Sequence, residues 1–233
     1  MWIKDCWKKQ DKNDFDEYLL SLQNKDRILW TTKIINTKQK VLAIKTQTLK
    51  NIAKEISKGN YLSFLDLNIN TFYENDIING NLICKIKDFD LQKKYLDNYV
   101  SKIDNWASCD LLSFFIKGKE EKYFSLALKY LKNTKPFIRR VGFKILFEFV
   151  ESEKYLKEIF NILNSFTNES EYYVNMIISW LVCELFIKQR EKTIEFLKTN
   201  KLNTFQINKA ISKCRDSFRV SKTDKEMLLQ FKK

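Results

Sequence analysis

Hydrophobic positions recur with a helical period along almost the whole chain. The stretches 143–150 and 171–187 are too apolar for helices with one solvent-facing side, so we expect them to be inner helices that pack on several sides. Amphipathic stretches such as 119–132 and 153–166 lie between them. The connections are short and polar, and Pro136 in one of them suits the first turn of a helix. The pattern therefore predicts buried helices that alternate with amphipathic ones.

The buried stretches centre near residues 110, 144 and 179, and a spacing of roughly 30 to 40 residues is typical of helix-pair repeats. The fold class that we expect is all-α, an α-solenoid of stacked antiparallel helix pairs. A helical bundle is the alternative. Because no linker interrupts the pattern, residues 1–233 are expected to form a single helical-repeat domain.

Composition supports a helical fold and narrows the possible chemistry. Only 4 glycines and 1 proline are present, too few for the many tight turns of sandwiches and barrels. The absence of histidine excludes serine-triad, Cys–His and histidine-based metal chemistry. The 5 cysteines stand singly, which argues against a zinc site or a disulfide framework and favours a reducing, cytoplasmic setting. We therefore expect no metal and no cofactor, and, because no apolar run is long enough to span a bilayer, no membrane partner.

Charge is large and unevenly distributed. The chain has 42 Lys and Arg against 29 Asp and Glu, a formal net charge of +13 that favours polyanions. Residues 31–58 hold seven Lys and one Glu, whereas residues 59–114 hold five Lys and eight acidic residues. Residues 115–150 and 201–233 each hold nine basic and three acidic residues. In a solenoid such segments could form a stripe that follows a phosphate backbone; the alternative is that lysine only solvates outer helix faces.

Three features of the buried stretches could carry chemistry. Trp106 and Asp110 are four residues apart and share a helical face, and a carboxylate among apolar neighbours needs a cation, a cap or a ligand. Arg139 and Arg140 can bind carboxylate or phosphate through two hydrogen bonds, or form a structural pair with Asp110. Trp180 belongs to a stripe that is mostly core, but a tryptophan often keeps one edge at a surface.

In this order and spacing, the three features resemble the DNA alkylation repair family, the AlkD-type HEAT-like-repeat DNA glycosylases. Residues 208–220 (Asn-Lys-Ala-Ile-Ser-Lys-Cys-Arg-Asp-Ser-Phe-Arg-Val) look like the closing segment of that family. Residues 42–54 are similar to its entry segment, with Ala43 where the family usually has Gly and Gln47 where it has Pro. The resemblance extends over about residues 30–230.

The resemblance implies a C-shaped α-solenoid of HEAT-like helix pairs that holds double-stranded DNA in a basic concave groove. It also implies that a monomer excises cationic N3- or N7-alkylated purines by hydrolysing the N-glycosidic bond. By match to the motif, Asp110 would be the catalytic carboxylate, and Trp106 and Trp180 would flank the deoxyribose of the lesion. The DNA-binding residues that the resemblance implies are Arg140, Arg139, Lys209, Lys213 and Arg219.

Two other functions stay open. Active members use an early helix with an aromatic residue against the DNA backbone, whereas residues 26–38 offer Ile34 and Ile35 there, with Trp30 a turn earlier. A non-catalytic DNA-binding paralogue is therefore the first alternative. A protein-binding helical scaffold is the second, because many solenoids bind proteins.

Overall fold

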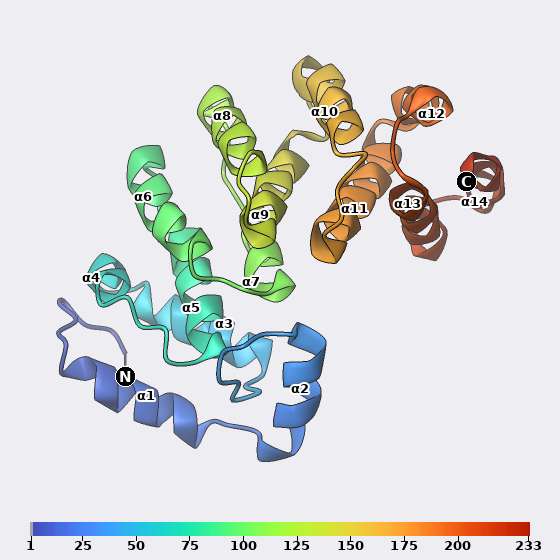
Figure 1. The fold of residues 1–233 in the computed structure, drawn as a ribbon. Coiled ribbons are helices and arrows are strands. Elements are labelled where there is room, and N and C mark those ends of the chain that lie inside the picture. Colours follow the sequence, from blue (N-terminus) through green and yellow to red (C-terminus); the bar gives the residue numbers. More distant parts are fainter. Residues whose placement is uncertain (1) are drawn as a thin grey trace. The chain divides into compact units, whose positions relative to one another are not determined.

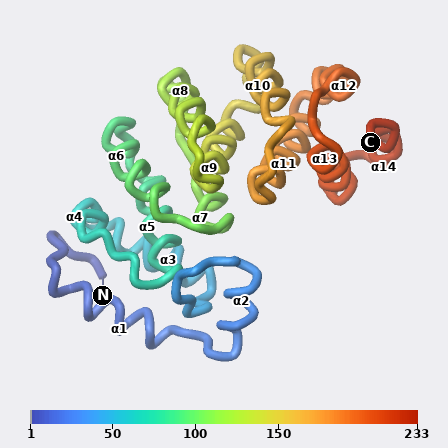
Figure 2. Tube along the Cα trace, in the orientation of Figure 1, coloured from blue at the N-terminus to red at the C-terminus, as the bar shows by residue number. Residues whose placement is uncertain are grey.

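The computed structural model describes residues 2–233, and within this range it contains α-helices and short 3₁₀ helices but no strand (Figures 1 and 2). The all-α fold class is therefore confirmed. Contacts group the helices into two compact units, unit 1 ending at Phe115 and unit 2 beginning at Ile116. The single repeat domain and its C shape stay predictions.

In unit 1, helix α5 is the central element, because it packs against α3, α4, α6 and α7 and buries nearly all of its side chains. Side chains of Asn60, Asp88 and Asn105 cap the first turns of α4, α6 and α7, as short polar residues do at helix starts. The helices of this unit are α1 Asp11–Ser21, α2 Ile28–Ile35, α3 Thr46–Ile56, α4 Tyr61–Asp66, α5 Tyr73–Ile83, α6 Phe89–Val100 and α7 Trp106–Asp110.

In unit 2, three helices form a packed row, in which α11 lies against both α9 and α13. Figure 1 shows α8, α10 and α12 in a second layer along one side of this row. The helices of this unit are α8 Glu120–Leu131, α9 Pro136–Leu146, α10 Glu153–Ser165, α11 Tyr172–Lys188, α12 Arg190–Thr199, α13 Thr204–Asp216 and α14 Lys222–Met227. The amphipathic and buried stretches predicted from the sequence are thus confirmed as α8, α10 and α11, and Pro136 starts α9 as predicted.

Two predicted stretches differ from the structure. The buried stretch centred near residue 110 is only the five-residue helix α7, because the chain leaves the helix at Leu111 and runs without regular structure to Gly118, whose φ is 77°. The apolar stretch 143–150 is the end of α9 followed by a 3₁₀ turn, Phe147–Phe149. Most apolar side chains of the two stretches are buried, although Leu111 and Phe147 are half-buried and Phe115 is 70% exposed. Hydrophobicity alone does not fix the length of a helix.

Candidate functional site

Helix α7 carries two of the expected site residues, Trp106 and Asp110. Hydrogen bonds of the two residues that precede it, Asp104 and Asn105, fix its first turn. The Asn105 side chain accepts a hydrogen bond from Ser108 N at 2.9 Å, which satisfies one of the backbone donors at the helix start. One residue earlier, the Asp104 carboxylate accepts from Thr37 Oγ1 at 2.6 Å and from Lys38 N at 2.8 Å. These bonds fix α7 to the segment that follows α2.

Trp106 is fixed by its indole. Its Nε1 donates to the backbone oxygen of Ile34, 3.1 Å away, in the last turn of α2. The side chain is half-buried, so part of the ring remains accessible beside α2. This bond sets the plane of the ring, which a packing contact alone would leave variable.

Asp110 is the last residue of α7 and lies one helical turn after Trp106, so the two side chains share a face as the spacing predicts. Asp110 is half-buried, whereas its neighbours Cys109 and Leu112 are fully buried. The carboxylate therefore stands at the edge of the apolar core of unit 1.

A buried polar cluster supports α7 from below. Tyr99 Oη donates to Ser108 O at 2.8 Å, and burial raises the pKa of this phenol well above its ordinary value. Asp76 is also buried, and Gln39 Nε2 donates to its carboxylate at 2.7 Å. Burial raises the pKa of Asp76 to about 7, and the charge of Asp104 adds to the increase.

The segment before α3 closes around a second buried carboxylate, Glu74. Both Glu74 oxygens accept from Leu42 N, at 3.0 and 3.1 Å, and Oε1 also accepts from Ile44 N at 3.4 Å. The chain presents these donors by turning at Ala43, whose φ is 58°. Burial raises the pKa of Glu74, although the backbone donors oppose this effect.

Helix α2 presents an apolar face to solvent. Leu29 is 85% exposed and Trp30 is 56% exposed, with the Arg27 guanidinium 4.7 Å from the Trp30 ring. Of the two isoleucines that the sequence offered here, Ile34 is exposed and Ile35 is buried. The exposed aromatic residue of this helix is therefore Trp30.

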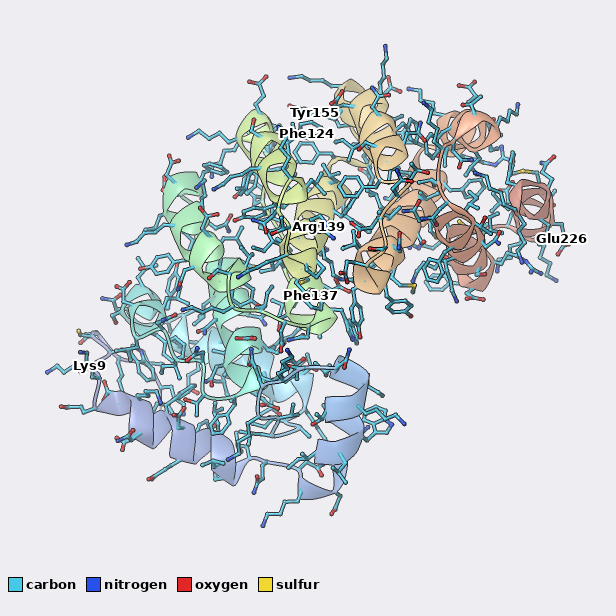
Figure 3. All side chains as sticks on the ribbon, viewed as in Figure 1. Lys9, Phe124, Phe137, Arg139, Tyr155 and Glu226 are labelled. Atoms are coloured by element: carbon cyan, nitrogen blue, oxygen red, sulfur yellow. The ribbon has the colours of Figure 1, made fainter. Side chains whose placement is uncertain are left out.

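The expected arginines of α9, in unit 2, both serve the structure. Arg139, labelled in Figure 3, lies on α9. It donates to Glu169 through Nε at 2.9 Å and Nη2 at 3.0 Å, and its Nη1 donates to the backbone oxygens of Asn133 and Thr134. The carboxylate that pairs with Arg139 is therefore Glu169 and not Asp110, the partner that the structural alternative named. Arg140 is buried, and its Nη1 donates to the backbone oxygen of Tyr173.

Trp180 lies on α11 in a small aromatic and cationic cluster. Its half-buried ring meets Phe147 edge-on, with centroids 4.9 Å apart. Lys144 Nζ lies 5.3 Å from the Phe147 ring and 6.0 Å from the Trp180 ring, within cation–π range. Sequence reasoning missed Lys144, although its position four residues after Arg140 was the available signal.

The basic residues of the closing segment have different environments. Lys209 and Lys213 are four residues apart on α13, and Lys209 Nζ lies 5.9 Å from the Phe205 ring. Arg219 instead donates through both terminal nitrogens to the Glu184 carboxylate. The charge of Arg219 is therefore compensated within the protein, whereas Lys209 is exposed to solvent.

Unit 1 thus brings together Trp106 and Asp110, and unit 2 brings together Lys144 and Trp180. No group of acidic, cysteine or histidine side chains suited to hold a metal ion occurs in the part of the chain that the structure describes. Over residues 2–233, every helix is too short or too polar to cross a membrane.

Comparison with known protein families matches residues 15–214 to the DNA alkylation repair enzymes. The match spans most of the 233 residues, so the chain belongs to the DNA alkylation repair enzyme family. A search of curated proteins found no match to the sequence.

Proposed function

We propose that this protein is a DNA glycosylase that excises cationic N3- or N7-alkylated purines from double-stranded DNA. The observation that carries the proposal is that α7, capped by Asn105, presents the indole of Trp106, bonded to Ile34 O, and the carboxylate of Asp110 on one face, in a member of the DNA alkylation repair enzyme family. An alkylated purine is cationic and already a good leaving group, so its removal needs little more than stabilisation of the sugar and a water molecule.

Asp110 is the residue that we assign to the reaction itself. Cleavage of the N-glycosidic bond builds positive charge on the deoxyribose, as in glycoside hydrolysis. A carboxylate fixed at the edge of an apolar core stabilises this charge and can align the attacking water. The electron pair of the broken bond leaves with the purine, whose positive charge it neutralises.

Trp106 is assigned to the deoxyribose, where an aromatic face favours a sugar that carries positive charge. Trp180, in unit 2, is assigned to the DNA that this unit contacts. Lys144, Lys209 and Lys213 are assigned to the phosphates, whose contacts position DNA without reading its sequence.

Arg140 and Arg139 have structural roles: they hold the first turn of α9 to the segment around α11. We assign no DNA contact to Arg219 because it is paired with Glu184.

The test is release of the damaged base from methylated duplex DNA. We expect the wild type to release 7-methylguanine or 3-methyladenine, and Asp110→Asn to lose at least about 100-fold in rate, the scale of one lost electrostatic stabiliser. Asp14→Asn is the matched control, because Asp14 is an exposed acid on α1. A wild type that binds DNA without releasing bases would identify the non-catalytic DNA-binding paralogue instead.

That second function is favoured by one observation, the apolar face of α2. Leu29 and Ile34 are exposed there, and the aromatic residue is Trp30. An α2 that differs from that of active members would lose the contact with the DNA backbone beside the lesion. The other basic residues would still bind DNA. If the wild type has no affinity for duplex DNA even at low salt, both DNA functions fail and a protein-binding scaffold remains.

A further inference from the structure

Unit 2 carries a continuous series of aromatic rings that the proposed excision chemistry does not use. Phe137, Tyr173, Tyr172 and Phe205, which we call the aromatic row, come from the first turns of α9, α11 and α13. Ring centroids are 5.4 Å apart between Phe137 and Tyr173, 5.2 Å between Tyr173 and Tyr172, and 5.9 Å between Tyr172 and Phe205. The row thus links all three inner helices of unit 2; Figure 3 labels its first member, Phe137.

The two ends of the aromatic row differ in burial. Phe137 and Tyr173 are half-buried and support the row from α9 and α11. Tyr172 is 55% exposed and Phe205 is 37% exposed, so two neighbouring rings offer apolar surface to solvent. Adjacent exposed rings of this kind mark an interaction site more often than scattered single ones do.

Lysines accompany the exposed end of the row. Lys209 Nζ lies 5.9 Å from the Phe205 ring and is exposed, and the exposed Lys201 precedes α13. Glu171, next to Tyr172, is the acidic residue at this end. The Lys209 cation beside paired aromatic faces favours a ligand that combines planar rings with negative charge.

We propose that the aromatic row binds single-stranded DNA, with unpaired bases stacked on Tyr172 and Phe205 and a phosphate near Lys209. Aromatic side chains beside basic residues bind single strands in this way because every base has a π-face, whatever the sequence. A duplex hides these faces in its own base stack, so this site prefers unpaired strands. The proposal goes beyond excision, and it rests on the proposed function only for the choice of DNA as the nucleic acid.

The experiment measures fluorescence anisotropy of a labelled oligothymidylate about 12 nucleotides long with the full chain. We expect Tyr172→Ala and Phe205→Ala each to weaken binding about five- to tenfold, as the loss of one base–aromatic stack does. Phe218→Ala is the matched control, because Phe218 is a 94% exposed aromatic residue of the same unit outside the row. It should change affinity less than twofold. Tyr172→Phe should bind like the wild type, because the ring face is kept.

Four results would overturn the proposal. They are no binding by the wild type, equal binding by the Tyr172→Ala/Phe205→Ala double variant, tighter binding of oligouridylate, and a dimer in light scattering that only the row variants abolish. The last would identify the row as a protein–protein contact. Because the oligonucleotide carries no lesion, these results do not depend on whether the protein excises bases.

Discussion

At the residue scale, Ala43 carries backbone strain for the sake of a buried carboxylate. Its φ of 58° is the left-handed region, which costs a residue with a Cβ about 1–2 kcal/mol. The turn is retained because it directs Leu42 N and Ile44 N at the Glu74 carboxylate. The position at which the family usually has Gly is thus one where glycine would relieve strain.

Ala43→Gly should therefore stabilise the protein. Relief of the left-handed strain exceeds the extra entropy that glycine gives the unfolded chain, so we expect a gain of about 0.5–1 kcal/mol in the free energy of unfolding. Urea denaturation followed by circular dichroism measures it. Ala53→Gly, inside α3, is the control and should lower stability. An Ala43→Gly protein less stable than the wild type would contradict the strain argument.

Asp76 should make stability depend on pH. Its pKa is about 7 in the folded protein, whereas an unfolded aspartate titrates near pH 4. The folded chain therefore binds an additional proton between these values, and its free energy of unfolding falls as the pH rises through this window, by up to about 4 kcal/mol. Asp76→Asn, which cannot ionise, should lack this fall. If the free energy of unfolding changed with pH in the same way for the wild type and Asp76→Asn, a raised pKa of Asp76 would be ruled out.

The sequence predicted the pairing of Trp106 with Asp110 because four-residue spacing is a local property of a helix. It did not predict the bond from Trp106 to the oxygen of Ile34, because that partner lies 72 residues away and depends on how α2 ends. Lys144 was missed for a related reason: its place beside Trp180 follows from the packing of α9 against α11. Spacing predicts which residues share a face, whereas tertiary packing decides what that face meets.

At the element scale, long apolar helices were predictable and their ends were not. The periodicity of residues 171–187 identified α11 within a residue at each end, because its core-facing positions continue around the helix. Near residue 110 the same kind of stretch gave only α7. The cap position of α11 is Glu171, whose side chain makes no capping bond. The helix starts where the extended backbone at Glu171 ends, and not at a residue whose side chain could cap it.

The connection between α10 and α11 depends on Arg139. Replacing it with Ala leaves the nearly buried Glu169 carboxylate without its bidentate partner, so we expect Arg139→Ala to lower the free energy of unfolding by about 3 kcal/mol. Chemical denaturation provides the measurement. Lys154→Ala, which removes the exposed pair with Glu121, should change little. Equal effects of the two substitutions would show that the Arg139 pair is no more than a surface contact.

At the scale of the whole molecule, the net charge of +13 should appear as salt-dependent DNA binding. If Lys144 and Lys213 each neutralise one phosphate, replacing both with Ala should reduce the slope of log affinity against log salt by about 2. Filter binding to an undamaged duplex over a range of salt concentrations measures this slope. Lys157→Ala, at an exposed position of α10, should leave it unchanged. An unchanged slope in the double variant would remove these two lysines from the DNA contact.

Single-turnover base release tests whether Asp110 on α7 promotes cleavage of the glycosidic bond of an alkylated purine, as we propose. Methylated duplex DNA is incubated with excess protein, so that every lesion is bound, and released 7-methylguanine is followed by chromatography. We expect release by the wild type and a rate at least about 100-fold lower for Asp110→Asn at similar DNA affinity. Equal rates for the two proteins, or no release by a wild type that saturates the DNA, would contradict this proposal.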